Sequence, residues 1–207
     1  MKLAVDAGLR VAPTRLVQAG GRDVLLVERF DREPDGGRRM LVSALTILGE
    51  TPMTGHYSSY PRLADEIRAR FTDPRETLHE LFRRIVFNVV VGDTDDHARN
   101  HAAFWDGSEL KLTPAYDICT QPRSGGGGTQ ALAISRSGDK RSRLHVCEAA
   151  ADAFHLAPRE ARDVVEHTVA VVEDGWAAAA DAVGLSEIDR NRLLKGAVLN
   201  PSIFYSD

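Results

Sequence analysis

The most constraining feature of the sequence is an apolar segment with strong helical periodicity that ends at a loop crowded with charge. Asp73 is a good N-cap, Pro74 suits the first helical position, and Glu76 completes a capping-box pattern. Apolar residues then recur three and four positions apart, and they are Leu78, Leu81, Phe82, Ile85, Val86, Val89 and Val90. Gly92 is expected to end the helix. The pattern predicts a core helix that delivers the following loop to a fixed place.

The loop after this helix carries more charge than surface loops usually hold. It reads D-T-D-D-H-A-R-N over residues 93–100. A short hairpin follows, with A-A-F-W and E-L-K-L on either side of D-G-S, and its second strand leads to Asp117. Such a cluster is either a functional site or an unusually acidic turn.

Three residues of this region have the layout of a protein-kinase active site. Asp95 and Asn100 stand in the pattern D-x-x-x-x-N, and Asp117 follows seventeen residues later. In kinases an aspartate accepts the hydroxyl proton, while an asparagine and a second aspartate hold the metal. Mg²⁺ prefers a few hard oxygen ligands, and a base in the same loop as one ligand keeps nucleophile and metal at a fixed separation. The bare motif is weak, but the helix, the hairpin and Asp117 together favour a site.

The other polar residues of the loop carry different expectations. His97 fits a surface histidine as well as a neighbour of bound phosphates. Asp93 and Asp96 are expected to be solvated bystanders. A transition-metal site of His97 and His101 is an alternative, which the lack of an H-E-x-x-H arrangement disfavours.

Composition excludes several classes of protein. With 207 residues, 43% hydrophobic and 27% charged, the chain can bury one good core and is not disordered. A net charge of −4 without a basic tail gives no support for direct nucleic-acid binding. No targeting signal and no long apolar window is visible, so we expect no membrane association and a cytoplasmic location. Cys119 and Cys147 lack metal-ligand spacing and are expected to be reduced packing residues.

The remaining segments predict a small β unit followed by a helical one. Residues 1–9 read as the last turns of a helix, and Gly20-Gly21 turns a hairpin between strands at 14–19 and 23–30. A polar loop at 31–38 marks a boundary. Further helices are predicted over residues 40–48, 61–71, 144–155, 159–183 and 187–197, and Ser186 and Asp189 offer a cap for the last of them. Residues 121–130 are predicted to form a mobile loop, which lacks the G-K-[ST] ending of a P-loop.

Three blocks of this sequence together resemble the HipA family. They are V-E-R-F-D-R, G-D-T-D-D-H-A-R-N-H and L-T-P-A-Y-D, in this order. The family comprises serine/threonine protein kinases that act as toxins in bacterial toxin–antitoxin pairs. The resemblance implies an α+β, protein-kinase-like fold, with residues 1–33 as the remnant of a small β N-lobe and 34–207 as a mainly α-helical C-lobe. It also implies ATP and Mg²⁺ as cofactors, a helix-turn-helix antitoxin as partner, and an aminoacyl-tRNA synthetase as substrate.

The resemblance also assigns roles to single residues. Asp95 resembles the catalytic base, and Asn100 and Asp117 resemble the Mg²⁺ ligands. His97 matches the loop histidine that lies near the nucleotide. Glu28 and Phe30 match the hinge, where backbone groups pair with the adenine edge.

One departure from the family pattern affects the expected activity. A family member carries, ahead of the residues that begin this chain, a glycine-rich phosphate loop and a lysine that reaches the phosphates. None of the four lysines here, which are Lys2, Lys111, Lys140 and Lys195, lies on a strand ahead of the hinge. Because clamping of the phosphates is a large part of catalysis, this polypeptide alone is expected to be a poor kinase. We therefore expect a fragment or a mis-started reading of a longer kinase, one half of a split kinase, or a degenerate relative.

Two other functions stay open. The chain could be a non-catalytic module that keeps the kinase surface and binds an antitoxin or substrate. It could also be a small-molecule phosphotransferase, since antibiotic kinases use the same base, asparagine and aspartate. Their loop usually begins with a histidine and glycine before the base, and Gly92-Asp93-Thr94 in that place disfavours this alternative.

Overall fold

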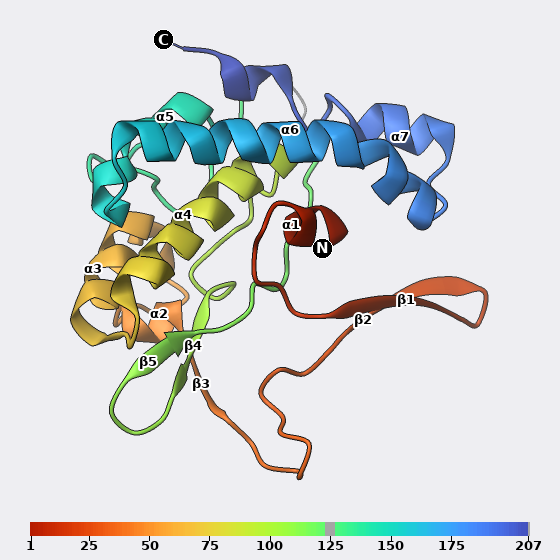
Figure 1. Ribbon diagram of the computed structural model, residues 1–207. Helices are drawn as coiled ribbons and strands as arrows, with labels where there is room; N and C mark the ends of the chain where they lie inside the picture. Colours follow the sequence, from red (N-terminus) through yellow and green to blue (C-terminus); the bar gives the residue numbers. More distant parts are fainter. Residues whose placement is uncertain (123–126, 207) are drawn as a thin grey trace.

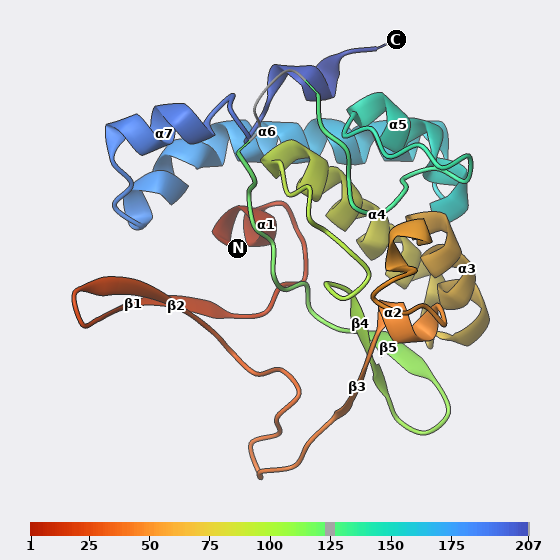
Figure 2. The ribbon, with the colours of Figure 1, turned by 180° about the vertical axis from the view of Figure 1, so that it is seen from behind.

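The structure is a computed structural model that describes residues 1–122 and 127–206. A helical body forms most of the molecule, and a long two-stranded hairpin projects from it in both views (Figures 1 and 2). The helices are α1 (Lys2–Asp6), α2 (Ala44–Ile47), α3 (Tyr60–Arg70), α4 (Pro74–Val91), α5 (Leu144–Ala149), α6 (Pro158–Ala182) and α7 (Glu187–Leu193), with 3-10 turns η1 (Gly55–Tyr57), η2 (Ala151–Phe154) and η3 (Pro201–Phe204). The strands are β1 (Thr14–Ala19), β2 (Arg22–Val27), β3 (Met40–Ser43), β4 (Ala102–Trp105) and β5 (Leu110–Leu112).

Helix α4 lies at the centre of the core, as its periodicity predicts. Its apolar face is fully buried, and the helix contacts α3, α5 and α6. Gly92 ends the helix in the left-handed region at φ 73°. The capping-box prediction is wrong, because the Asp73 side chain makes no capping hydrogen bond and only its backbone carbonyl accepts from Thr77 N. The apolar face, rather than the cap, therefore sets the position of this helix.

The strands form two separate antiparallel sheets. β1 and β2 pair from Thr14 with Val27 to Ala19 with Arg22, around the predicted glycine turn. The other sheet has the order β3-β4-β5. The predicted helix over residues 40–48 is wrong in its first half, because Met40–Ser43 is strand β3 and only the following residues form α2. A short apolar run suits a helix or a strand equally, and here the edge of β4 supplies backbone partners from Met40 to Ser43.

Several other boundaries differ from the prediction. The helix expected over 144–155 is broken into α5 and η2, and α7 ends at Leu193, short of 197. Strand β2 ends at Val27, before the predicted Phe30. The cap of α7 is confirmed, because Ser186 Oγ accepts from Asp189 N at 3.1 Å. The loop predicted over 121–130 lies partly outside the described residues, and the division into residues 1–33 and 34–207 stays a prediction.

The structure also bears on the predictions about membrane association and about the two cysteines. Within the described ranges, every helix is too short or too polar to cross a membrane. Both cysteines are free thiols. Cys147 is buried in the core as expected, whereas Cys119 is exposed, so the packing role predicted for Cys119 is wrong.

We expect Gly92→Ala to destabilise the fold much more than Gly20→Ala. Both glycines have positive φ, which costs a residue with a side chain about 1–2 kcal/mol. A Cβ at Gly92 would also lie 2.7 Å from the carbonyl oxygen of Ala197, whereas one at Gly20 meets nothing within 4 Å. Urea unfolding should therefore show a loss of about 1 kcal/mol for Gly20→Ala and about 3 kcal/mol or more for Gly92→Ala. Equal losses would contradict the close contact with Ala197.

Candidate active site

A series of hydrogen bonds holds the segment that carries Asp117 beside the loop that carries Asp95 and Asn100. The two segments run antiparallel, residues 113–121 against 92–102. The bonds run from Thr113 N to Ala102 O (3.0 Å), from Tyr116 Oη to Arg99 O (2.7 Å), from Cys119 N to Asp93 Oδ2 (3.2 Å) and from Gln121 N to Gly92 O (2.9 Å). Asp117 thus lies in the middle of a segment that is attached on both sides to the acidic loop.

The three residues predicted to carry the chemistry differ in how far they are exposed to solvent. Asp95 and Asp117 are exposed, and within the described residues their carboxylates have no hydrogen-bond partner. Asp117 adopts φ 58°, a left-handed conformation that aspartate tolerates better than most residues. Asn100 is 7% exposed, and its backbone N donates to His97 O at 2.8 Å. Two carboxylates are therefore free to meet a ligand beside a largely buried amide.

Asp93 is not the solvated bystander that the sequence suggests. It is 2% exposed, and its two carboxylate oxygens accept from the backbone N of Asp95 at 3.3 Å and of Cys119 at 3.2 Å. Burial, and then the negative charge of Asp96, raise the pKa of Asp93 to about 7. This side chain joins the loop of Asp95 to the segment of Asp117.

Asp96 is also buried, so the expectation of a solvated side chain is wrong here too. Its Oδ2 accepts hydrogen bonds from Tyr60 Oη, from Asn88 Nδ2 at 2.7 Å and from His101 Nε2 at 3.0 Å. Burial alone would raise the pKa of Asp96, but the charge and hydrogen bond of His101 and the bonds from Tyr60 and Asn88 hold it below its ordinary value. Asp96 thus anchors the loop to α3 and α4, while its neighbour Asp95 faces outward.

His97 belongs to the surface of the loop and contacts Arg99. Its Nε2 lies 3.2 Å from Arg99 Nη2, so this ring nitrogen accepts and Nδ1 carries the proton. Nδ1 is buried and has no partner among the described residues. The transition-metal alternative is wrong, because His101 is engaged by Asp96 and no group of three or more His, Cys, Asp or Glu side chains in residues 1–122 and 127–206 could hold a metal ion.

The local field nevertheless suits a hard divalent cation. Burial, followed by the charges of Asp93, Asp117 and Asp95, raises the pKa of the Cys119 thiol, so each of these carboxylates lies near Cys119. Mg²⁺ is typically held by one or two protein carboxylates together with substrate phosphates, rather than by a full protein cage. The free carboxylate of Asp117 and the amide of Asn100 are donors of this kind, so these residues fit Mg²⁺.

The predicted hinge residues lie between the hairpin and the acidic loop. The Glu28 backbone N donates to Pro13 O at 2.9 Å, and Glu28 lines a cavity of about 410 Å³ at the base of the hairpin. The ring of Phe30 contacts Phe104 at 5.9 Å and Tyr116 at 5.6 Å between centroids. Because Tyr116 precedes Asp117, Phe30 packs directly beside the segment that carries Asp117.

Sequence reasoning missed a buried ion pair beneath the site. Glu80 and Arg84 are 0% and 2% exposed, and Arg84 Nε donates to Glu80 Oε1 at 3.0 Å. Arg84 Nη2 donates to Thr113 O at 2.8 Å, and the Arg10 backbone N donates to Glu80 Oε1 at 3.2 Å. The pair joins α4 to the start of the segment that leads to Asp117. Its only signal in the sequence is a Glu–Arg spacing of four within an otherwise apolar helix.

The raised pKa of Asp93 predicts that stability falls as the pH rises toward neutral. The unfolded chain releases this proton near 3.8 and the folded chain near 7, so the folded state binds more protons between these values. Its contribution is complete below pH 3.8 and is lost as the pH rises through about 7, by at most about 4 kcal/mol. Asp93→Asn should remove this fall in urea unfolding measured without Mg²⁺. Asp163→Asn, at an exposed position of α6, should retain it, and an unchanged slope in Asp93→Asn would contradict the assignment.

The fold of this chain is found in two solved kinases. HipA in the Shewanella oneidensis complex of HipA, HipB and operator DNA matches with a TM-score of 0.75 and 22% identity, over 94% of this chain and 51% of that chain. The Helicobacter pylori proinflammatory kinase CtkA matches with a TM-score of 0.62 and 14% identity, over 97% of this chain and 79% of that chain. The predicted kinase-like α+β fold is therefore confirmed.

Sequence comparisons agree with the structural ones. Y4mE of Sinorhizobium fredii is 32% identical over 126 residues, which cover 57% of this chain and 30% of Y4mE. The serine/threonine-protein kinase toxin HipA of Shewanella oneidensis is 26% identical over 137 residues, 57% of this chain and 32% of HipA. The chain thus spans about a third of the length of these relatives. The profile of the HipA-like C-terminal domain matches residues 1–176, and the chain belongs to this family.

Proposed function

We propose that this chain is the catalytic-lobe part of a serine/threonine protein kinase that transfers the γ-phosphoryl group of ATP to a protein hydroxyl. The observation that carries the proposal is the hydrogen-bonded pairing of the Asp95 loop with the Asp117 segment. It supports a base and two metal ligands that act at one place. The family and the fold are consistent with this chemistry.

Each proposed role is consistent with the exposure and the hydrogen-bond partners of the residue. Asp95 is exposed and free of partners, and it accepts the proton of the attacking hydroxyl. Asn100 and Asp117 hold Mg²⁺, which when bound neutralises charge on the phosphate oxygens. His97 lies beside the phosphates. Asp93 and Asp96 fix the loop from both sides of Asp95, so that little reorganisation is needed when substrate binds.

The hinge provides the place for the adenine ring. Glu28 lines the cavity of about 410 Å³ together with Pro13 and Val27. Backbone groups at Glu28 and Phe30 pair with the adenine edge in this proposal. The aromatic contact of Phe30 with Tyr116 then connects adenine binding to the position of the metal ligand Asp117.

We also propose the partners that the relatives suggest. HipA of Shewanella oneidensis has been determined in a complex with HipB and operator DNA. A helix-turn-helix antitoxin is accordingly the proposed partner of this chain, an aminoacyl-tRNA synthetase its proposed substrate, and the cytoplasm its proposed location.

A non-catalytic binding module is the second candidate, favoured by the positions of the lysines. Lys2 Nζ contacts Asp6 at 2.6 Å, and Lys140 Nζ donates to the carbonyls of His56 and Ala131, both at 2.9 Å. None of the four lysines lies on β1 or β2. In this alternative the chain keeps a surface for an antitoxin or substrate, and Asp95 has no role in it.

Asp95→Asn separates the two candidates. We expect phosphoryl transfer to fall by about 10²–10⁴-fold, with Mg-ATP binding retained, because the general base is lost and the metal ligands remain. Transfer from radiolabelled ATP is measured with the 207-residue chain and with the chain extended by any in-frame coding sequence upstream of Met1. Asp73→Asn, at an exposed site beyond the far end of α4, is the control and should leave transfer unchanged.

The outcomes are distinct. Asp117→Ala should abolish the Mg²⁺ dependence of nucleotide binding as well as transfer, since it removes the free carboxylate of the metal site. An Asp95→Asn protein with full transfer, or an extended protein with no transfer to any acceptor, would refute the kinase proposal. Transfer to hydroxylated small molecules but not to proteins would favour a small-molecule phosphotransferase.

A further inference from the structure

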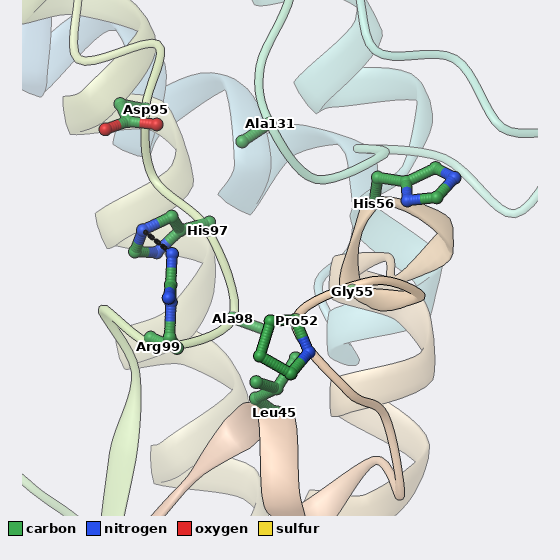
Figure 3. A pocket seen from close by; sticks show the side chains of 9 residues that line it. All are labelled: Leu45, Pro52, Gly55, His56, Asp95, His97, Ala98, Arg99 and Ala131. Carbon is green, nitrogen blue, oxygen red and sulfur yellow. Dashed lines mark hydrogen bonds between the residues drawn. The ribbon is translucent and has the colours of Figure 1, made fainter.

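A cavity of about 280 Å³ opens beside Asp95, on the side of the loop that bears His97 and Arg99 (Figure 3). Leu45, Pro52 and Ala98 give it an apolar floor, and His56 lies on the opposite side from His97 and Arg99, with its ring turned away from them in this view. Neither Asn100 nor Asp117 lines it, so it is distinct from the proposed metal site.

The polar lining of this cavity consists of the Asp95 carboxylate, the Arg99 guanidinium and the imidazoles of His56 and His97. Among the described residues no carboxylate lies within ion-pair distance of Arg99, whose Nη2 contacts only the acceptor nitrogen of His97. His56 supplies a second imidazole. Lys140 reinforces the wall, because its Nζ donates to the backbone carbonyls of His56 and Ala131. An exposed arginine that has no ion-pair partner among the described residues can bind an anionic group.

Size and surroundings indicate which anion. With a volume of about 280 Å³, at the lower end of the roughly 300–1,000 Å³ of ligand pockets, this cavity has room for one side chain. Beside it, the loop 51–57 exposes Met53 to 83% and Tyr57 to 72%. Exposed apolar side chains next to a charged cavity offer contacts to a longer chain, such as a protein segment.

We propose that this cavity binds the carboxylate side chain of an Asp or Glu that lies close to the phosphorylated hydroxyl residue in a protein substrate. The proposal rests on the kinase function proposed above and specifies its substrate class. The acceptor hydroxyl reaches Asp95, Arg99 binds the neighbouring carboxylate, and His56 lines the same cavity. Met53 and Tyr57 contact apolar residues further along the segment.

The test uses peptides that share one serine and differ at each flanking position in having Asp, Asn or Lys. Fluorescence anisotropy without ATP measures binding, and transfer assays on the extended protein measure kcat and KM for peptide and for ATP. We expect an acidic residue at one or two positions to improve binding and kcat/KM by roughly tenfold over Asn, the usual strength of one charged hydrogen bond. Arg99→Gln should remove this preference and leave the KM for ATP unchanged.

Arg75→Gln is the matched control. Arg75 is an exposed arginine at the start of α4, the end remote from the loop, and its replacement should keep the preference for acidic peptides. A circular dichroism melt of Arg99→Gln verifies that the variant is folded. His56→Gln should weaken the preference partly, because Arg99 remains.

Two other results overturn the proposal, and a third separates the subsite from the kinase function. Equal binding of acidic and neutral peptides by the wild-type protein would do so even if transfer is observed, and the kinase function would then stand without this subsite. An Arg99→Gln variant with a raised KM for ATP and an intact peptide preference would assign Arg99 to the nucleotide phosphates. Selective binding of acidic peptides without transfer would instead refute the kinase function and retain the subsite.

Discussion

The geometry of the site depends on two buried carboxylates that flank one exposed carboxylate. A carboxylate removed from water is tolerated only when its oxygens are hydrogen-bonded, so Asp93 and Asp96 each fix the groups that surround them. Asp93 binds two backbone N–H groups, one on each of the two segments that form the site. Asp96 binds side chains of α3 and α4 and that of His101, which precedes β4. Asp95, which lies between them in the sequence, is exposed to solvent.

The interior and the surface of the site use charge in opposite ways. Beneath it, Glu80 and Arg84 form a pair that is almost fully enclosed and whose hydrogen bonds reach two other segments. Such a pair adds little net stability, but removal of one partner leaves an uncompensated buried charge, so the arrangement is specific. At the surface, Asp95, Asp117 and Arg99 lack ion-pair partners in the described part of the chain. These unpaired charges are available to a cation on one side and an anion on the other.

The periodicity of apolar residues predicts the core well where a segment is long enough to fit only one kind of secondary structure. The apolar stripe of α4 extends over many turns, and a helix buried along that face is its single solution. The four residues from Met40 to Ser43 are too few for their pattern to distinguish a helix from a strand. They form a strand because they pair with β4, which lies more than fifty residues later in the chain. At Asp73 the sequence correctly predicts where the helix begins, but the predicted hydrogen bond of its side chain is not formed.

Residue types at short, fixed spacings are enough to predict the family, the kinase-like fold and the candidate roles of Asp95, Asn100 and Asp117. Which of the neighbouring charged residues are structural follows only from how distant segments pack together. Whether a loop carboxylate is solvated depends on what packs against it, and the partners of Asp93 and Asp96 include Cys119 and Tyr60, which are distant in the chain. The same reason hides the cavity at Arg99, since His56 and Ala131 reach it from two other segments.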